Sequence, residues 1–485
     1  KIVGVLTALL IVTLALPVFA KSHGGHMDDK IDVEFGGEIK TVFDVGSYGD
    51  NEAAAMLLWE DDDVLDEDSA ADPDLFPAEK AFYQDVDFDI AGTVNDNINF
   101  DLAIDTVTKN FTGVEGPSYN VEGDDSTLGN PGANSDLTVD TKTLTVSDGV
   151  STLRIGDLGG FMADAYFIDD EDLEGMEVTT SMNNADMRGF VLGQDNGVNT
   201  NQSNVTKGNA TDFYGLTYTQ NLANGSVTGK LYSERMEGNG LSTYAVEGSF
   251  DVNEAMTVGA EVAANDADED TSNINGTQDG DTLMRANAEY MVSDAISVNG
   301  KVEMVGDDFA VSSYNDLEEP SAYDLYTVGG EMELDANNSV NAAYTLVANN
   351  NDNGNNPDDK STIEVGFDNV TGNYNNHASI ALTTDDNYNG DDTTVIKLGT
   401  EYAMDAATLS AELTNQSSDY DNEFNYLAVN YDQTVTENVT WNTEFGYLDG
   451  TANGDLTNSN DNVVYTANDA DAESTHLETA MTIKF

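Results

Sequence analysis

Apolar and polar residues alternate over many short segments of the chain. Over 86–104 the even positions are mostly apolar and the odd positions mostly carry Asp, Asn or Thr, with a polar break at 95–97. Successive side chains of a strand point to opposite faces, so this pattern predicts two strands joined by a tight turn. Similar pairs recur over 244–262, 284–304, 326–346 and 427–447. The sequence therefore predicts an all-β protein built from consecutive hairpins.

The turns within these pairs are short, whereas the stretches between pairs are long and polar, as at 265–281 and 349–360. This asymmetry is typical of a membrane barrel with short periplasmic turns and long outer loops. We predict a transmembrane antiparallel up-and-down β-barrel with an even number of strands, about 16–22, the first over 31–45. A soluble β-sandwich would also alternate, but the apolar positions here include many Gly, Ala, Thr and Tyr, which disfavours a dry core.

The two ends of the chain carry sorting information. Residues 1–20 read as a signal peptide, with Lys1, an apolar stretch, Pro17, and the small residues Val18 and Ala20 before the cleavage point. The remaining 21–485 is predicted to be a single barrel domain. The last strand ends on its apolar face with Phe485. It resembles the terminal targeting strand of bacterial outer-membrane barrel proteins, which implies a membrane-targeting role for Phe485.

The amino-acid composition limits the classes of molecule that this protein is expected to bind. The 485 residues include 91 acidic and 17 basic side chains, a net charge of −74, and no cysteine. Disulfides and thiolate metal sites are excluded, and nucleic acid is disfavoured as a partner because both polymers are anionic. Such dense carboxylates also suggest a saline habitat, where salt screens their mutual repulsion.

The segment 144–157 resembles the hairpin that precedes the constriction loop of general bacterial outer-membrane porins, with a similar turn and a strand that ends in Gly and Arg. The resemblance implies that the following segment, 159–175, is a constriction loop that folds into the pore. It also implies a homotrimer, although the sequence shows no interface. Such porins have sixteen or eighteen strands and an arginine-rich wall, whereas this chain is longer and has few arginines.

Candidate pore-lining residues come from this loop and from the polar face of the predicted strands. The loop contributes Asp164, Asp169, Asp170, Glu171, Asp172 and Glu174, and the strands contribute Arg154, Arg285, Glu289, Lys301, Glu331 and Glu401. Because carboxylates outnumber cations on the polar face, we expect a preference for cations. For any single residue, a role in hydrating the inner wall is the simpler interpretation.

We therefore expect an unplugged, water-filled pore for passive diffusion of ions and small hydrophilic solutes, with outer-membrane lipids as its surroundings. The alternative is a structural or adhesive surface protein in which the barrel is an anchor and the acidic loops do the work. An enzyme is not expected, since the nearest suggestion of a nucleophile and base, Ser379 with His377, lacks a third group. No cofactor and no metal site are expected.

Overall fold

The computed structural model describes residues 32–48, 81–95, 97–108, 138–193, 211–236, 239–267, 280–312, 317, 322–349, 359–385, 392–418, 423–457 and 463–485. Their regular elements are β1 (Asp32–Tyr48), β2 (Ala81–Asn95), β3 (Ile98–Thr108), β4 (Thr138–Ser147), β5 (Ser151–Phe161), β6 (Glu171–Met182), β7 (Ala185–Gly193), β8 (Asp212–Leu222), β9 (Gly225–Met236), β10 (Asn239–Asn253), β11 (Met256–Ala267), β12 (Thr282–Ser293), β13 (Ile296–Val305), β14 (Tyr323–Asp335), β15 (Asn338–Asn349), β16 (Lys360–Thr371), β17 (Tyr374–Asp385), β18 (Thr393–Ala403), β19 (Ala407–Ser418), β20 (Glu423–Thr436), β21 (Val439–Thr457) and β22 (Val463–Lys484).

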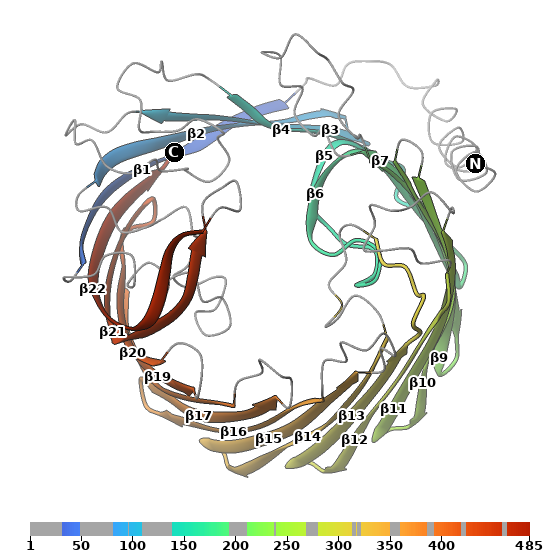
Figure 1. Cartoon of the computed structure of the whole chain (residues 1–485). Helices are drawn as coiled ribbons and strands as arrows, with labels where there is room; N and C mark the ends of the chain where they lie inside the picture. The colour runs from blue at the N-terminus through green and yellow to red at the C-terminus, as the bar shows by residue number, and fades with distance from the viewer. Residues whose placement is uncertain are drawn as a thin grey trace.

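These strands form one closed sheet. Each strand pairs antiparallel with the next, and β22 pairs with β1 from Glu38 opposite Lys484 to Tyr48 opposite Ser474. Figure 1 shows the resulting ring, viewed along its axis. The prediction of an antiparallel up-and-down barrel is confirmed, and its strand number is twenty-two. Among the described residues no helix is long and apolar enough to cross a membrane.

One end of the barrel consists of tight turns, which we call the turn end. At this end, a turn of two or three residues connects each even-numbered strand from β2 to β20 to the strand that follows it. Side chains at the ends of the strands stabilise several of these turns. Asn253 Oδ1 accepts from the Ala255 amide (2.8 Å) and Asp335 Oδ1 from the Asn337 amide (2.8 Å). Asn, Asp and Ser therefore fix the turns by satisfying backbone donors locally. The opposite end, from which the longer connections emerge, is the loop end.

The apolar face of the strands points outward. Val246 and Val328 are about three-fifths exposed (61% and 59%), and the same face carries other exposed large apolar residues around the ring. These include Val262, Met284, Val298, Ile363, Val365, Leu382, Leu398 and Leu413. Such a continuous apolar surface is unfavourable in water and suits contact with lipid chains.

The seam between the first and last strands extends to Phe485. Its backbone amide donates to the Gly37 carbonyl (3.1 Å), which adds one bond beyond the end of β22. Its ring lies edge-on to Phe88, with centroids 6.0 Å apart, and is half exposed. The residue therefore joins the outer apolar surface at the turn end.

Candidate functional site

The hairpin of β5 and β6 leaves the wall and enters the lumen, as the teal ribbon in Figure 1 shows. The cause is a bulge in β5, where the register moves from Leu158 opposite Leu173 to Phe161 opposite Glu171. Gly160 lies in this bulge with a φ of 60°, which favours glycine, and its amide donates to Asp172 Oδ1 (2.9 Å). A bulge bends its strand, so the two residues that follow Leu158 redirect the hairpin inward.

The predicted loop 159–175 is thus a hairpin whose arms are strands. Only residues 162–170 connect the two strands, and Glu171, Asp172 and Glu174 belong to β6. The segment 159–175, predicted to be a constriction loop, therefore includes the ends of both strands. Once the segment leaves the wall it has no neighbouring strand on either side, so its backbone groups are satisfied by pairing its two arms.

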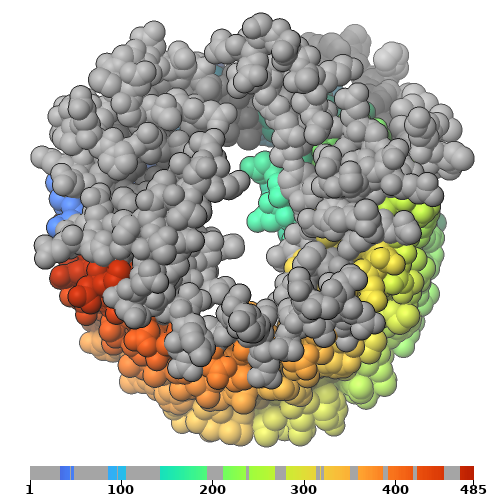
Figure 2. All heavy atoms as spheres, in the orientation of Figure 1, coloured from blue at the N-terminus to red at the C-terminus, as the bar shows by residue number. Residues whose placement is uncertain are grey.

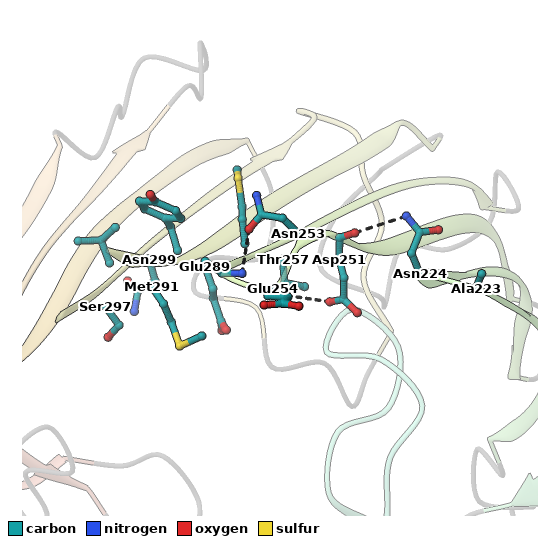
Figure 3. A pocket seen from close by; sticks show the side chains of 14 residues that line it. Ala223, Asn224, Asp251, Asn253, Glu254, Thr257, Glu289, Met291, Ser297 and Asn299 are labelled. Atoms are coloured by element: carbon teal, nitrogen blue, oxygen red, sulfur yellow. Dashed lines mark hydrogen bonds between the residues drawn. The ribbon is translucent and has the colours of Figure 1, made fainter. Parts of the chain in front are cut away.

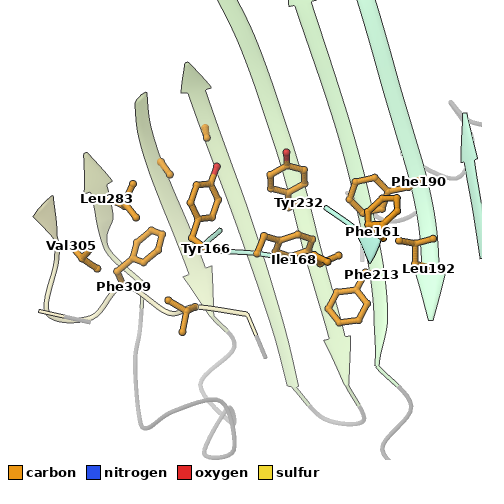
Figure 4. Packing of buried hydrophobic residues seen from close by; sticks show 14 of the residues in the cluster. Phe161, Tyr166, Ile168, Phe190, Leu192, Phe213, Tyr232, Leu283, Val305 and Phe309 are labelled. Atoms are coloured by element: carbon orange, nitrogen blue, oxygen red, sulfur yellow. The ribbon is translucent and has the colours of Figure 1, made fainter. Parts of the chain in front are cut away.

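An apolar cluster holds the hairpin against the inner wall (Figure 4). Tyr166, Phe167 and Ile168 are almost fully buried. The Phe167 ring stacks on Tyr232 of β9 with centroids 4.8 Å apart, and Phe161 meets Phe190 of β7 edge-on at 4.9 Å. The other residues that the inner wall contributes to this cluster are Leu192, Phe213, Ala245, Ala263, Leu283, Val305, Tyr323, Leu325 and Val347. Phe309 and Val311, from the connection after β13, also belong to the cluster.

A buried lysine joins the hairpin to the wall. Lys230 of β9 is 7% exposed, and its Nζ lies 2.7 Å from Asp164 Oδ1, 2.8 Å from Glu247 Oε2 and 3.0 Å from Glu261 Oε1. The hydroxyl of Tyr166 donates to the same Glu261 oxygen (2.8 Å). Burial raises the pKa of Tyr166 far above its usual range, so this hydroxyl stays protonated and keeps donating. One ammonium group thereby forms ion pairs with carboxylates of both the hairpin and the wall.

Two arginines add to the attachment. Arg188 of β7 donates to the Met162 carbonyl (2.7 Å) and to Glu177 (2.6 Å), and its guanidinium lies 4.5 Å above the Phe161 ring. Arg285 of β12 pairs with Glu303 and lies 5.4 Å from the centroid of the Tyr166 ring. All four arginines of the chain, the other two being Arg154 and Arg235, lie on β5 to β12, either on the hairpin strands or on the wall against which the hairpin packs.

Arg285 was predicted to line the pore, and the structure places it on the inner wall beside Tyr166 of the hairpin. Its side chain is only 19% exposed, because the hairpin lies over it and Glu303 binds it. The alternation of β12 places Arg285 on the inner face correctly, but the inner face of this sector is covered. Arg154 and Lys301 remain more open, with side chains 43% and 49% exposed, beside Glu177 and Glu303 respectively.

The carboxylates of the hairpin divide into attached and open groups. Asp164 is bound to Lys230, whereas Asp170 and Asp172 are exposed. Glu174 is exposed at the base and pairs with Lys142 (3.2 Å). Asp169 and Glu171 are half-buried. The free charge of the hairpin thus lies mainly on Asp170 and Asp172.

The remaining predicted residues lie on another level of the barrel. Glu289, Glu331 and Glu401 are exposed and stand within a few residues of the turn end of β12, β14 and β18. Glu289 lines a cavity of about 710 Å³ at that end, together with Asp251 and Glu254 (Figure 3). Glu289, Glu331 and Glu401 therefore do not meet the hairpin. They contribute negative charge to the opening of the barrel at its turn end.

The sector that the hairpin leaves uncovered is acidic. The inner-face carboxylates of β14 to β22 and β1 to β3 include Glu331, Glu333, Glu364, Asp368, Glu401, Glu412, Glu444, Glu478, Asp87, Asp89 and Asp101. Lys40, Lys397 and Lys484 share this face. Figure 2 shows an opening through the molecule, bordered on one side by the teal hairpin. Among the described residues, no group of three or more His, Asp or Glu side chains is placed to hold a metal ion.

A second hairpin lies inside the ring. The far ends of β21 and β22, the longest strands, turn inward opposite the β5–β6 hairpin in Figure 1. The inner-face residues Phe424, Leu448 and Ala452 are buried.

The fold is similar to several solved structures. OccK11 (OpdR) of Pseudomonas aeruginosa is 8% identical, with a TM-score of 0.40 over 94% of this chain and 96% of that one. OccAB3 of Acinetobacter baumannii is 12% identical, with a TM-score of 0.40 over 94% and 100%. The copper transporter OprC is 11% identical, with a TM-score of 0.49 over 93% and 80%. No family model and no curated protein matches the sequence.

The architecture itself defines the class. A closed antiparallel barrel with an even strand number, tight turns at one end and an apolar outer surface is the fold of an integral outer-membrane β-barrel. A polar, charged interior distinguishes it from a soluble barrel with a dry core.

Proposed function

We propose that the protein is an outer-membrane channel for passive diffusion of ions and small hydrophilic solutes. The observation that carries this proposal is the one-sided hairpin, which packs on the inner wall from β7 to β15 and borders an opening through the molecule. A surface protein that uses its barrel only as an anchor needs no such opening. The charged inner wall keeps the lumen filled with water. Lipids of the outer membrane contact the apolar outer surface.

The same geometry supports a preference for cations. The basic side chains of the covered sector are used in ion pairs, so they neutralise their own partners and add little field to the open lumen. The open sector presents Glu331, Glu401, Glu412 and their neighbours to permeating ions. A low-dielectric wall strengthens the field of such carboxylates.

Single-channel recording on the purified protein in planar bilayers tests the pore. We expect stepwise currents and, in a KCl gradient near 0.1 M, a reversal potential of the sign for K⁺ selectivity. Toward molar salt the preference should weaken, because the Debye length falls from about 10 Å to about 3 Å. Absence of stepwise current would favour the anchoring alternative, and anion selectivity in dilute KCl would contradict the acidic lumen.

Membrane assembly can be tested at the terminal residue. The substitution Phe485→Asp places a charge on the outer face and removes the ring that meets Phe88. We expect less folded barrel in outer-membrane fractions, although the direct cost near the interface is only about 0–1 kcal/mol, because the targeting signal is lost as well. Phe485→Tyr is the matched control and should assemble normally. Equal levels for both variants would contradict the targeting role.

A further inference from the structure

His377 and Glu412 form a pair that crosses an intervening strand. His377 lies on β17 and Glu412 on β19, and both are in register with Gly399 of β18 between them. His377 Nε2 is 2.7 Å from Glu412 Oε2. Alternate strands of a sheet are about 9.5 Å apart, so the side chain of the middle strand normally keeps such residues separate.

Gly399 makes this contact feasible. A Cβ atom at this position would lie 1.8 Å from Cε1 and 2.1 Å from Nε2 of His377. The imidazole therefore occupies the space that any other residue at position 399 would fill. Both members of the pair remain accessible to the lumen, since their side chains are 42% and 39% exposed.

The surroundings of the pair are charged. On the inner face of the adjacent strands, Asp368 of β16 is in register with His377, Lys397 and Glu401 of β18 flank Gly399, and Glu364 lies farther along β16. Carboxylates outnumber the single lysine. The pair therefore lies in an acidic part of the inner wall.

We infer that the His377–Glu412 pair sets a pH dependence of ion selectivity, with His377 as a specificity-determining residue of the lumen. This inference rests on the proposed function. With a neutral imidazole the pair carries the single negative charge of Glu412. When the ring takes up one proton from solution, the pair becomes neutral overall and the acidic sector loses one negative charge. Histidine is the side chain that ordinarily changes charge between about pH 5 and 8, whereas carboxylates in water stay ionised there.

The test compares reversal potentials of the reconstituted channel in dilute KCl, near 0.1 M, at about pH 8 and about pH 6. We expect the K⁺ to Cl⁻ permeability ratio to fall as the pH falls. For an ion about 7 Å from the ring, one added charge changes local occupancy by about 1.5- to 3-fold after screening. His377→Gln should abolish most of this response and keep the selectivity of the unprotonated channel at both pH values.

A matched histidine control separates His377 from titration elsewhere. His476 of β22 also lies on the inner face, in register with Gly446 and Gly46. His476→Gln should keep the greater part of the response. A response lost in His476→Gln and retained in His377→Gln would overturn the assignment.

Gly399→Ala tests the pair rather than the histidine alone. The added methyl group would displace the imidazole from Glu412, so the pH response of the selectivity should differ from that of the unsubstituted channel. Gly300→Ala in β13 is the control, because its Cβ would meet only the Thr327 carbonyl oxygen at an ordinary 3.6 Å. A pH response in Gly399→Ala identical to that of the unsubstituted channel would refute the role of Glu412.

The outcomes distinguish this inference from the proposed function. A channel that prefers cations equally at pH 8 and 6 retains the proposed function and refutes the pH dependence. A chain that gives no stepwise current at either pH refutes the channel itself.

Discussion

Replacing residues 162–170 by a two-residue Asn-Gly turn between Phe161 and Glu171 should raise the unitary conductance about twofold or more. The hairpin packs on the inner wall from β7 to β15 and occupies one side of the lumen, so shortening it should widen the path of the ions. An Asn-Gly turn suits a two-residue hairpin connection. The measurement is the size of single-channel current steps in concentrated KCl.

The matched control keeps the hairpin and removes its open charge. Asp170→Asn with Asp172→Asn leaves the apolar cluster and the Lys230 attachment intact, because neither side chain belongs to them. This double variant should keep the conductance in concentrated salt and reduce the cation preference in dilute salt. If the shortened hairpin gives unchanged conductance, residues 162–170 do not narrow the path of the ions.

Lys230→Met should lower the free energy of unfolding by about 3–5 kcal/mol. Methionine preserves an unbranched apolar stem, but Asp164 and Glu261 then stay buried without their ammonium partner. Removing one partner of a buried ion pair is costly because the remaining charge is desolvated without compensation. Heat-induced unfolding in detergent, followed by gel mobility, measures the loss.

Two further variants test whether the uncompensated buried carboxylates cause the loss of stability in Lys230→Met. Lys397→Met removes a lysine from the uncovered sector, where solvent screens charges, and should change the unfolding free energy by less than about 1 kcal/mol. Adding Asp164→Asn and Glu261→Gln to Lys230→Met removes the uncompensated carboxylates, and should restore much of the lost stability. A Lys230→Met protein as stable as the Lys397→Met protein would show that the attachment contributes little.

The apolar cluster inside the lumen is indicated by a sequence pattern that differs from strict alternation of polar and apolar residues. Several strands of the covered sector place large apolar residues side by side, as in Leu231 with Tyr232, and Leu283 with Met284. A strand with one face in lipid and one in water has no reason for this pattern. Two apolar faces indicate that the inner one is covered, and the structure shows the β5–β6 hairpin as the cover.

The sequence by itself determined the strands, their turns and the direction of each face, since these depend on neighbours one or two residues apart. Only the tertiary structure decided which side chains meet across the lumen. Lys230 binds Asp164 and Tyr166 binds Glu261. Alternation assigns a residue to the inner face, but it contains no information on whether a distant segment covers that face. The bend at Gly160 and the curvature of the closed sheet supply that information, so they decide that Arg285 supports a hairpin while Glu401 faces the water.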